Sequence, residues 1–138
     1  MIKSLDNEFK DLFFKSFFDK VSFSDPFEFC LGYFLEDKLV GAIDYSVIYD
    51  RVEINYIAVL TDYRRRGIAQ ALFDECVRKT NFMPISLEVN VNNKEAVNFY
   101  LKNGFVKCAI RRKYYGNDDA YLMILEMKWF NVYFSYWI

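Results

Sequence analysis

Three segments of the chain carry apolar residues every three or four positions, which is the spacing of one helix face. The predicted helices span residues 6–21, 66–80 and 92–103. The last has clear ends, because Asn92 suits the N-cap, Glu95 can complete a capping box, and Gly104 can adopt the left-handed conformation that follows a helix. A further helical turn is expected at residues 25–28, where Pro and Glu follow an Asp that can act as N-cap.

The other apolar segments are short runs rich in β-branched and aromatic residues and bounded by turn residues, so they predict strands. These strands cover residues 2–4, 31–35, 39–48, 52–59, 85–89, 105–113 and 120–128. Short links make neighbouring strands antiparallel, whereas the helix between 52–59 and 85–89 makes those two parallel. We expect one α/β domain over residues 1–138, with a mixed, mostly antiparallel sheet of six to seven strands and helices on both faces.

The junction between the strand at 52–59 and the helix at 66–80 carries the strongest local signal. A short polar turn leads into the run Arg64-Arg65-Arg66-Gly67-Ile68-Ala69. The first backbone N–H groups of a helix have no partner within it, and the helix dipole adds partial positive charge there. The small residues Gly67 and Ala69 allow close approach, so the junction predicts a pyrophosphate site. An ordinary basic turn that caps a helix has the same pattern.

Composition narrows the chemistry. The net charge is -1, and the basic residues cluster at 64–66 and 111–113, which favours local anion sites over a nucleic-acid surface. Because there is no histidine, proton transfer falls to carboxylates, tyrosines, lysines, cysteines or water. The three cysteines show neither metal-ligand nor disulfide spacing, so we expect no metal, buried thiols and a reducing, cytoplasmic setting.

No apolar run is long enough to span a membrane, and charges interrupt the N-terminal segment, so no membrane anchor or signal peptide is expected. The apolar, aromatic stretch 129–138 could form a last strand, pack on the core or contact a partner. The oligomeric state stays open between a monomer and a weak homodimer.

Two segments of the chain together resemble one known superfamily. In the first, Arg64, Gly67 and Ala69 fit the pattern Gln/Arg-x-x-Gly-x-Gly/Ala, the coenzyme-A loop of the GNAT superfamily of N-acetyltransferases. In the second, residues 86–105 resemble the Leu-Glu-Val, Asn, Ala, Tyr and Gly-Phe block of the same superfamily. The combination is far more specific than either motif, and it implies the GNAT fold, with acetyl-CoA as cosubstrate at a parallel strand pair.

Residues 110–115 and 119–123 are similar to those of the RimI-like family, whose bacterial members acetylate the N-terminal alanine of a ribosomal protein. The resemblance covers about residues 50–128 and implies a protein or peptide N-terminus as acceptor. The stretch 21–30 departs from the family because it is short, and in the family this region forms one wall of the acceptor groove. A small-molecule amine therefore stays open as the acceptor, as does a coenzyme-A-binding domain without turnover.

The resemblance implies that Glu88 is the general base for the amine and that Tyr100 is the general acid for the departing thiolate. Glu88 could instead face solvent or cap a helix, and Tyr100 could be an ordinary core aromatic. Glu53, on the preceding strand, is a rival that could share the proton transfer or bind the acceptor's ammonium group.

The remaining site residues also follow from the resemblance. Ala58 and Val59 would offer backbone groups to the pantetheine arm, and Asn93 would hydrogen-bond it or serve only as a turn residue. Tyr114 and Tyr115 would close over the acceptor, or form an ordinary cross-strand pair. The expected cofactor-binding residues are Ala58, Val59, Arg64, Arg65, Arg66, Gly67, Ile68, Ala69 and Asn93. The expected substrate-binding residues are Glu53, Tyr114 and Tyr115.

Overall fold

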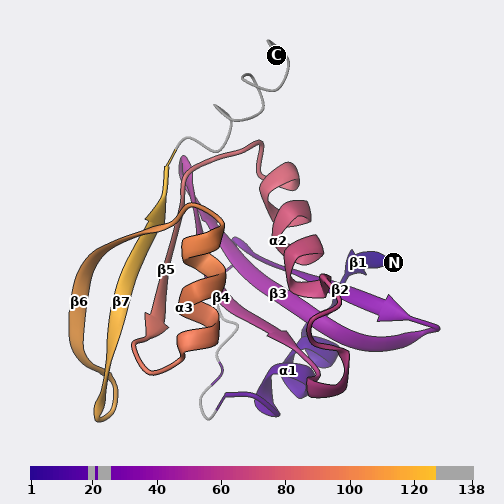
Figure 1. Ribbon diagram of the computed structural model, residues 1–138. Helices are drawn as coiled ribbons and strands as arrows, with labels where there is room; N and C mark the ends of the chain where they lie inside the picture. The colour runs from indigo at the N-terminus through magenta and orange to yellow at the C-terminus, as the bar shows by residue number, and fades with distance from the viewer. Residues whose placement is uncertain (19–20, 22–25, 127–138) are drawn as a thin grey trace.

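The computed structural model describes residues 1–18, 21 and 26–126, which form one seven-stranded sheet with helices on both faces (Figure 1). The strand order across the sheet is β1-β2-β3-β4-β5-β7-β6. The elements in chain order are β1 Ile2–Ser4, α1 Asn7–Lys15, β2 Glu28–Leu35, β3 Lys38–Ile48, β4 Arg51–Val59, the 3-10 helix η1 Thr61–Tyr63, α2 Ile68–Lys79, β5 Ile85–Asn90, α3 Lys94–Lys102, β6 Val106–Tyr115 and β7 Asp118–Leu125. The predicted fold class is confirmed.

The strands β4 and β5 form the parallel pair that their connecting helix predicts. Their ladder runs from the Val52–Ile85 pair to the Ile54–Leu87 pair. Beyond it the two strands diverge toward their carboxyl ends, as Figure 1 shows. The two strands are therefore paired at their amino ends and unpaired toward their carboxyl ends.

A bulge in β4 marks the start of this divergence. The pairing of β4 with β3 skips Asn55, which is therefore an extra residue on β4. Its side-chain amide donates to Asp44 Oδ1 at 3.0 Å and to Ser46 Oγ at 2.9 Å. A bulge bends a strand and increases its twist, and here it turns the second half of β4 away from β5.

The carboxylate of Asp44, which accepts the bond from Asn55, also contacts the first helix. Asp44 is fully buried, and its Oδ2 lies 3.4 Å from Nζ of Lys10 in α1. Burial raises the pKa of Asp44 to about 6, although hydrogen bonding from Asn55 and the charge of Lys10 act in the opposite direction. The helix α1 thus supports the bulge from its own face of the sheet.

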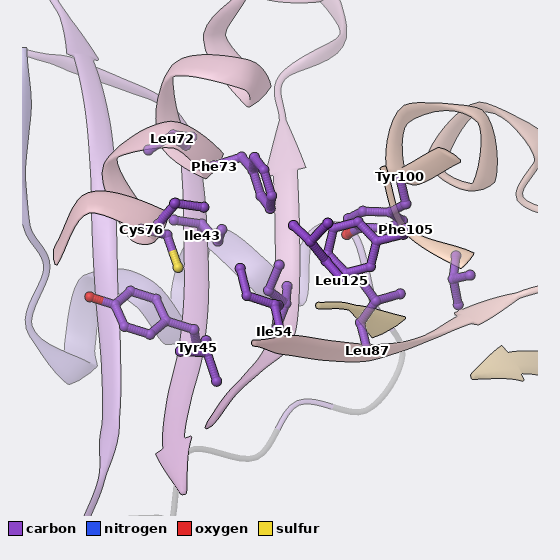
Figure 2. Packing of buried hydrophobic residues seen from close by; sticks show 14 of the residues in the cluster. Ile43, Tyr45, Ile54, Leu72, Phe73, Cys76, Leu87, Tyr100, Phe105 and Leu125 are labelled. Carbon is purple, nitrogen blue, oxygen red and sulfur yellow. The ribbon is translucent and has the colours of Figure 1, made fainter. Parts of the chain in front are cut away.

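Two apolar clusters lie on the two faces of the sheet. The larger joins α2 and α3 to the strands (Figure 2); its members include Ile43, Tyr45, Ile54, Leu72, Phe73, Cys76, Leu87, Tyr100, Phe105 and Leu125. The smaller packs Phe14 of α1 on Cys30, Ala42 and Ala58. The packing of these helices fixes the strand ends that carry the candidate site.

The first helix is shorter than its apolar spacing predicts. It ends at Lys15 instead of residue 21, because the hydroxyl of Ser16 donates to Phe13 O at 2.7 Å and closes the last turn. Phe17 and Val21 still pack against the smaller cluster, which explains why their positions follow the helical period. The helical turn expected at 25–28 is wrong for Glu28, which already belongs to β2.

The start of the third helix also differs by one residue. The N-cap is Asn93, not Asn92, and its Oδ1 accepts a hydrogen bond from Ala96 N at 3.2 Å. The stretch 129–138 lies outside the described residues, so its role stays a prediction. Among the described helices, none has the length and apolar character needed to cross a membrane.

Candidate active site

The second half of β4 has one edge without a strand partner in the described part of the chain. On its other edge, Ala58 lies opposite Ala42 and Val59 opposite Gly41 of β3. An extended ligand can pair with such a backbone edge as another strand would. Arg64 already uses one group there, because its Nε donates to Val59 O at 3.1 Å. Leu60 N donates to Val40 O of β3, and backbone groups alternate between the two edges of a strand. The Val59 backbone therefore faces the edge that the divergence of β5 leaves open, whereas the Ala58 backbone faces β3.

The N-terminus of α2 lies at the same end of the sheet as this edge (Figure 1). Gly67 is the N-cap with φ 78°, and Arg65 also has a positive φ of 63°. The first backbone N–H groups of a helix have no intrahelical partner, and no side chain caps those of α2. A Cβ at Gly67 would meet nothing within 4 Å, so the backbone conformation, not space, favours glycine here.

The three arginines of this turn have different surroundings. Besides its bond to β4, Arg64 lies 4.0 Å from Glu95 Oε2 of α3. Arg66 donates to Asp62 O at 3.3 Å. Within the described part of the chain, Arg65 has no hydrogen bond or ion pair, so its guanidinium is available to an anion at the helix end.

The other predicted coenzyme residues contribute differently. Ile68 and Ala69 form the first turn of α2, and Ile68 is buried, so they offer backbone N–H groups to a ligand. Asn93 uses its side-chain oxygen to cap α3, so the structure shows the turn role that the sequence left open.

Glu88 lies near the end of β5 and faces away from the α2–α3 core, because its neighbours Leu87 and Val89 point into that core. Its side chain is 12% exposed, and Oε1 lies 3.2 Å from Nη1 of Arg111. The other carboxylate oxygen, Oε2, is buried and has no hydrogen-bond partner among the described residues. One oxygen is therefore held by the protein, and the other is left for a ligand.

Two tyrosines of β6 adjoin Glu88. The hydroxyl of Tyr115 donates to Glu88 O at 3.1 Å, and the rings of Tyr114 and Tyr115 meet edge-on with centroids 4.9 Å apart. The neighbouring Glu88 carboxylate, together with burial, raises the pKa of Tyr114 to about 12. Burial and the same charge raise the pKa of Tyr115. Both phenols therefore remain protonated at neutral pH.

A bulge in β6 aims its side chains toward β5. The register with β7 shifts between Arg111 and Tyr115, and Lys113 has a positive φ of 55°. The Lys113 N–H donates to Asp119 Oδ1 at 2.9 Å. Because β7 separates β6 from β5, Arg111 passes over the small, buried Ala120 directly opposite it to reach the carboxylate.

Tyr100 belongs to the α3 side of the sheet and is 4% exposed. Its ring packs edge-on against Phe99, with the centroids 5.4 Å apart. It also packs edge-on against Phe105, 5.3 Å away (Figure 2). Burial, with the neighbouring Tyr115 and Cys76, raises the pKa of Tyr100. Its hydroxyl has no hydrogen-bond partner among the described residues. Tyr100 is thus both a core aromatic and a protonated phenol with an unused proton.

The rival carboxylate lies apart from this group. Glu53 pairs with Ser86, two residues before Glu88, so the two glutamates share one face of the sheet. The described residues show no contact between them. The structure thus brings Tyr114 and Tyr115 to Glu88, with Tyr100 on the opposite face, and leaves Glu53 outside the contact network.

Arg111 is the site residue that the sequence-based set lacks. It lies on β6, whereas Glu88 lies on β5, and the two are separated by β7 and by more than twenty positions in the chain. No local motif signals such a pair. Only the strand order and the bulge in β6 bring the two side chains together.

The sheet, the diverging strand pair and the uncapped helix define a class of protein that comparison identifies directly. The profile of the Acetyltransferase (GNAT) family matches residues 2–105, and the chain belongs to this family. The predicted resemblance to the GNAT superfamily is confirmed.

Comparison with individual proteins finds relatives whose names specify the kind of acetyltransferase. The N-alpha-acetyltransferase of Sulfurisphaera tokodaii is 43% identical over 72 residues, which are 49% of this chain and 43% of that protein. The ribosomal protein bS18-alanine N-acetyltransferase of Escherichia coli K12 is 35% identical over 89 residues, 59% of this chain and 60% of that protein. The matched segments thus make up about half the length of these curated relatives.

A solved structure matches over a longer stretch. The ribosomal-protein-S18-alanine N-acetyltransferase of Escherichia coli superimposes with a TM-score of 0.77 at 23% identity, covering 91% of this chain and 92% of that chain. This likeness shows the fold. The curated relatives confirm the predicted resemblance to the RimI-like family.

Proposed function

We propose that the chain is an acetyl-CoA-dependent N-acetyltransferase that acts on a protein N-terminal amine, with the N-terminal alanine of a ribosomal protein as its acceptor. One observation carries the proposal: the unpartnered Oε2 of Glu88, buried near the end of β5 where β4 and β5 part. A buried carboxylate oxygen without a partner is costly, and an amine or a water that delivers its proton there offsets that cost.

The residues around the divergence suit acetyl-CoA. The free edge of β4 at Val59 can pair with the amides of a pantetheine arm. The uncapped N-terminus of α2 and the unpaired Arg65 suit a pyrophosphate. When bound, the coenzyme supplies an acetyl group activated as a thioester.

Two protein groups then handle protons from opposite faces of the sheet. Glu88 accepts a proton from the amine, directly or through a water, at Oε2. Tyr100 holds a proton for the departing sulfur, and its raised pKa keeps that proton in place until it is needed. Arg111 and Tyr115 hold Glu88 in position during the transfer.

The surroundings of the thiols support direct attack by the amine, without an acyl-enzyme. Burial raises the pKa of Cys76 to about 12, and burial also raises the pKa of Cys30. Neither thiol therefore supplies a thiolate nucleophile at neutral pH. Cys108 is exposed on β6, where its Sγ lies 3.7 Å from Val106 O.

The acceptor assignment rests on the aromatic pair and on relatives. Tyr114 and Tyr115 form a protonated, half-exposed wall beside Glu88, which suits an extended peptide terminus. The names of the matched relatives specify N-alpha-acetylation and ribosomal-protein alanine acetylation. The proposal takes the protein to work in the cytoplasm, where ribosomal proteins are made.

The test is to incubate the purified protein with acetyl-CoA and a hexapeptide that begins Ala-Arg. Thiol release is followed while mass spectrometry detects the peptide. We expect one acetyl group on the α-amine. Acetylation confined to spermidine or amino acids would replace the peptide acceptor with a small amine. Coenzyme binding without any thiol release, across peptides and small amines, would leave a non-catalytic domain.

A further inference from the structure

The pairing of Arg111 with Glu88 has a role of its own. We propose that Arg111 is the positioning residue of the catalytic carboxylate: it fixes Oε1 so that Oε2 alone meets the acceptor. The inference rests on the proposed function, because it takes Glu88 to be the base.

The geometry singles out one oxygen for each task. Arg111 Nη1 lies 3.2 Å from Oε1, and no described residue bonds to Oε2. A carboxylate on a flexible stem has two equivalent oxygens, and a single charge-assisted bond is enough to make them different. The bond therefore sets which oxygen receives the proton and where it points.

The backbone of β6 is shaped for this contact. The bulge between Arg111 and Tyr115 lets the two residues reach the same glutamate, one at its carboxylate and the other at its backbone oxygen. The small Ala120 of β7 leaves room for the arginine to pass. The guanidinium also lies over the Tyr114 ring, 5.8 Å from its centroid, which restricts it further.

A purely structural ion pair does not account for this arrangement. The Arg111 side chain is 55% exposed, on a strand whose residues are all exposed, whereas Glu88 is 12% exposed. Solvent screens the arginine end of the pair, which limits its contribution to stability. What the pair changes is the carboxylate: its orientation and the charge beside it. Removal of Arg111 is therefore expected to lower turnover much more than it destabilises the fold.

The experiment compares Arg111→Met, Arg111→Lys and Lys107→Met in the full chain. Lys107 is the matched control, because it is an exposed cation on the same strand whose ammonium lies over Tyr121, away from Glu88. Thiol release is measured with the Ala-Arg hexapeptide over a range of pH values and acetyl-CoA concentrations. Thermal melting of each variant checks folding.

We expect Arg111→Met to lower kcat about 10- to 100-fold, with KM for acetyl-CoA unchanged, since small displacements of a reacting group have effects of that size. Arg111→Lys keeps the charge and restores part of the rate. Lys107→Met behaves as wild type.

Several outcomes would overturn the inference. An Arg111→Met enzyme as active as Lys107→Met, or more active than wild type, would show that the arginine does not orient the base. Glu88→Gln distinguishes failure of the proposed function from failure of this inference. An active Glu88→Gln enzyme would show that Glu88 is not the base. An inactive Glu88→Gln enzyme together with a fully active Arg111→Met enzyme would contradict only the role of Arg111.

Discussion

The two ends of the candidate site are built from different materials. The coenzyme end uses main chain: an uncapped helix start at Gly67 and an unpaired edge of β4. The acceptor end uses side chains that converge from separate strands: Glu88 of β5 with Arg111 and the tyrosines of β6. The first end is encoded locally in one turn, while the second exists only after the sheet has assembled. Substitutions should therefore act differently at the two ends.

The largest effect is expected at the acceptor end, from Glu88→Gln. The amide keeps the size of the side chain but cannot accept the proton as a carboxylate does, so kcat should fall about 10²- to 10⁴-fold. Acetyl-CoA affinity, measured by calorimetry, should stay the same because the coenzyme end is untouched. The parallel variant Glu53→Gln tests the rival carboxylate: a greater loss of kcat there would transfer the base role to Glu53.

Tyr100→Phe is expected to have the next largest effect. The ring keeps its packing against Phe99 and Phe105, so the melting temperature should change little. Loss of the proton donor should lower kcat about 10- to 100-fold, which single-turnover thiol release would measure. A variant that unfolds early but, once folded, turns over at the wild-type rate would leave Tyr100 as a core residue only.

At the coenzyme end, Gly67→Ala should weaken acetyl-CoA binding severalfold. The left-handed backbone at φ 78° costs a residue with a Cβ about 1–2 kcal/mol, and relief of that strain would move the N–H groups of α2. Calorimetry gives the Kd and melting gives the stability.

Gly116→Ala is the matched control for this change, because Gly116 also has a positive φ, 69°, and open space around it, but lies in the β6–β7 turn. Both variants should lose similar stability, and only Gly67→Ala should lose coenzyme affinity. Equal affinity in the two variants would contradict a backbone-built coenzyme site.

The smallest effect on activity is expected at Asp44, the buried carboxylate beside the bulge in β4, where the change is in stability. The pKa of Asp44 is raised to about 6 in the folded chain, against about 3.9 in an unfolded one. Between these values the native state binds the extra proton, so the contribution of Asp44 to stability falls as pH rises through this window and stays low above it.

Asp44→Asn removes that titration. The free energy of unfolding of the variant minus that of the wild type should therefore rise by about 1–3 kcal/mol from pH 4 to pH 7. Loss of the contact between Asp44 and Lys10 adds an offset that does not depend on pH. Urea unfolding at the two pH values measures the difference. A difference that is independent of pH would show that Asp44 does not titrate in this window.

The contrast between the two ends also explains what the sequence could and could not predict. The expected coenzyme turn could be predicted because Gly67 and the arginines before it form one contiguous sequence motif. The strands and their order follow from short links and one crossover helix. Helix ends were harder: the apolar period continued through Phe17, while Ser16 ended the helix by a hydrogen bond that the period does not report.

The acceptor end was only partly predictable, for a topological reason. Glu88, Tyr114 and Tyr115 were found through a resemblance to a family, and their mutual contact was not visible in the chain. Arg111 was missed because the pair spans an intervening strand. Nothing in the local sequence marks Asn55 as an extra residue either, since its role depends on the register with β3.

The divergence of β4 from β5 thus depends on one extra residue in β4, Asn55. Deletion of Asn55 would let β4 keep step with β3 and remove the bend that separates β4 from β5, while Tyr56 and the residues after it keep their partners on β3. The shortened chain would retain Glu88, Tyr100 and the arginine turn. A one-codon deletion in this strand is thus a route by which such a domain loses its ligand while every recognisable catalytic residue remains.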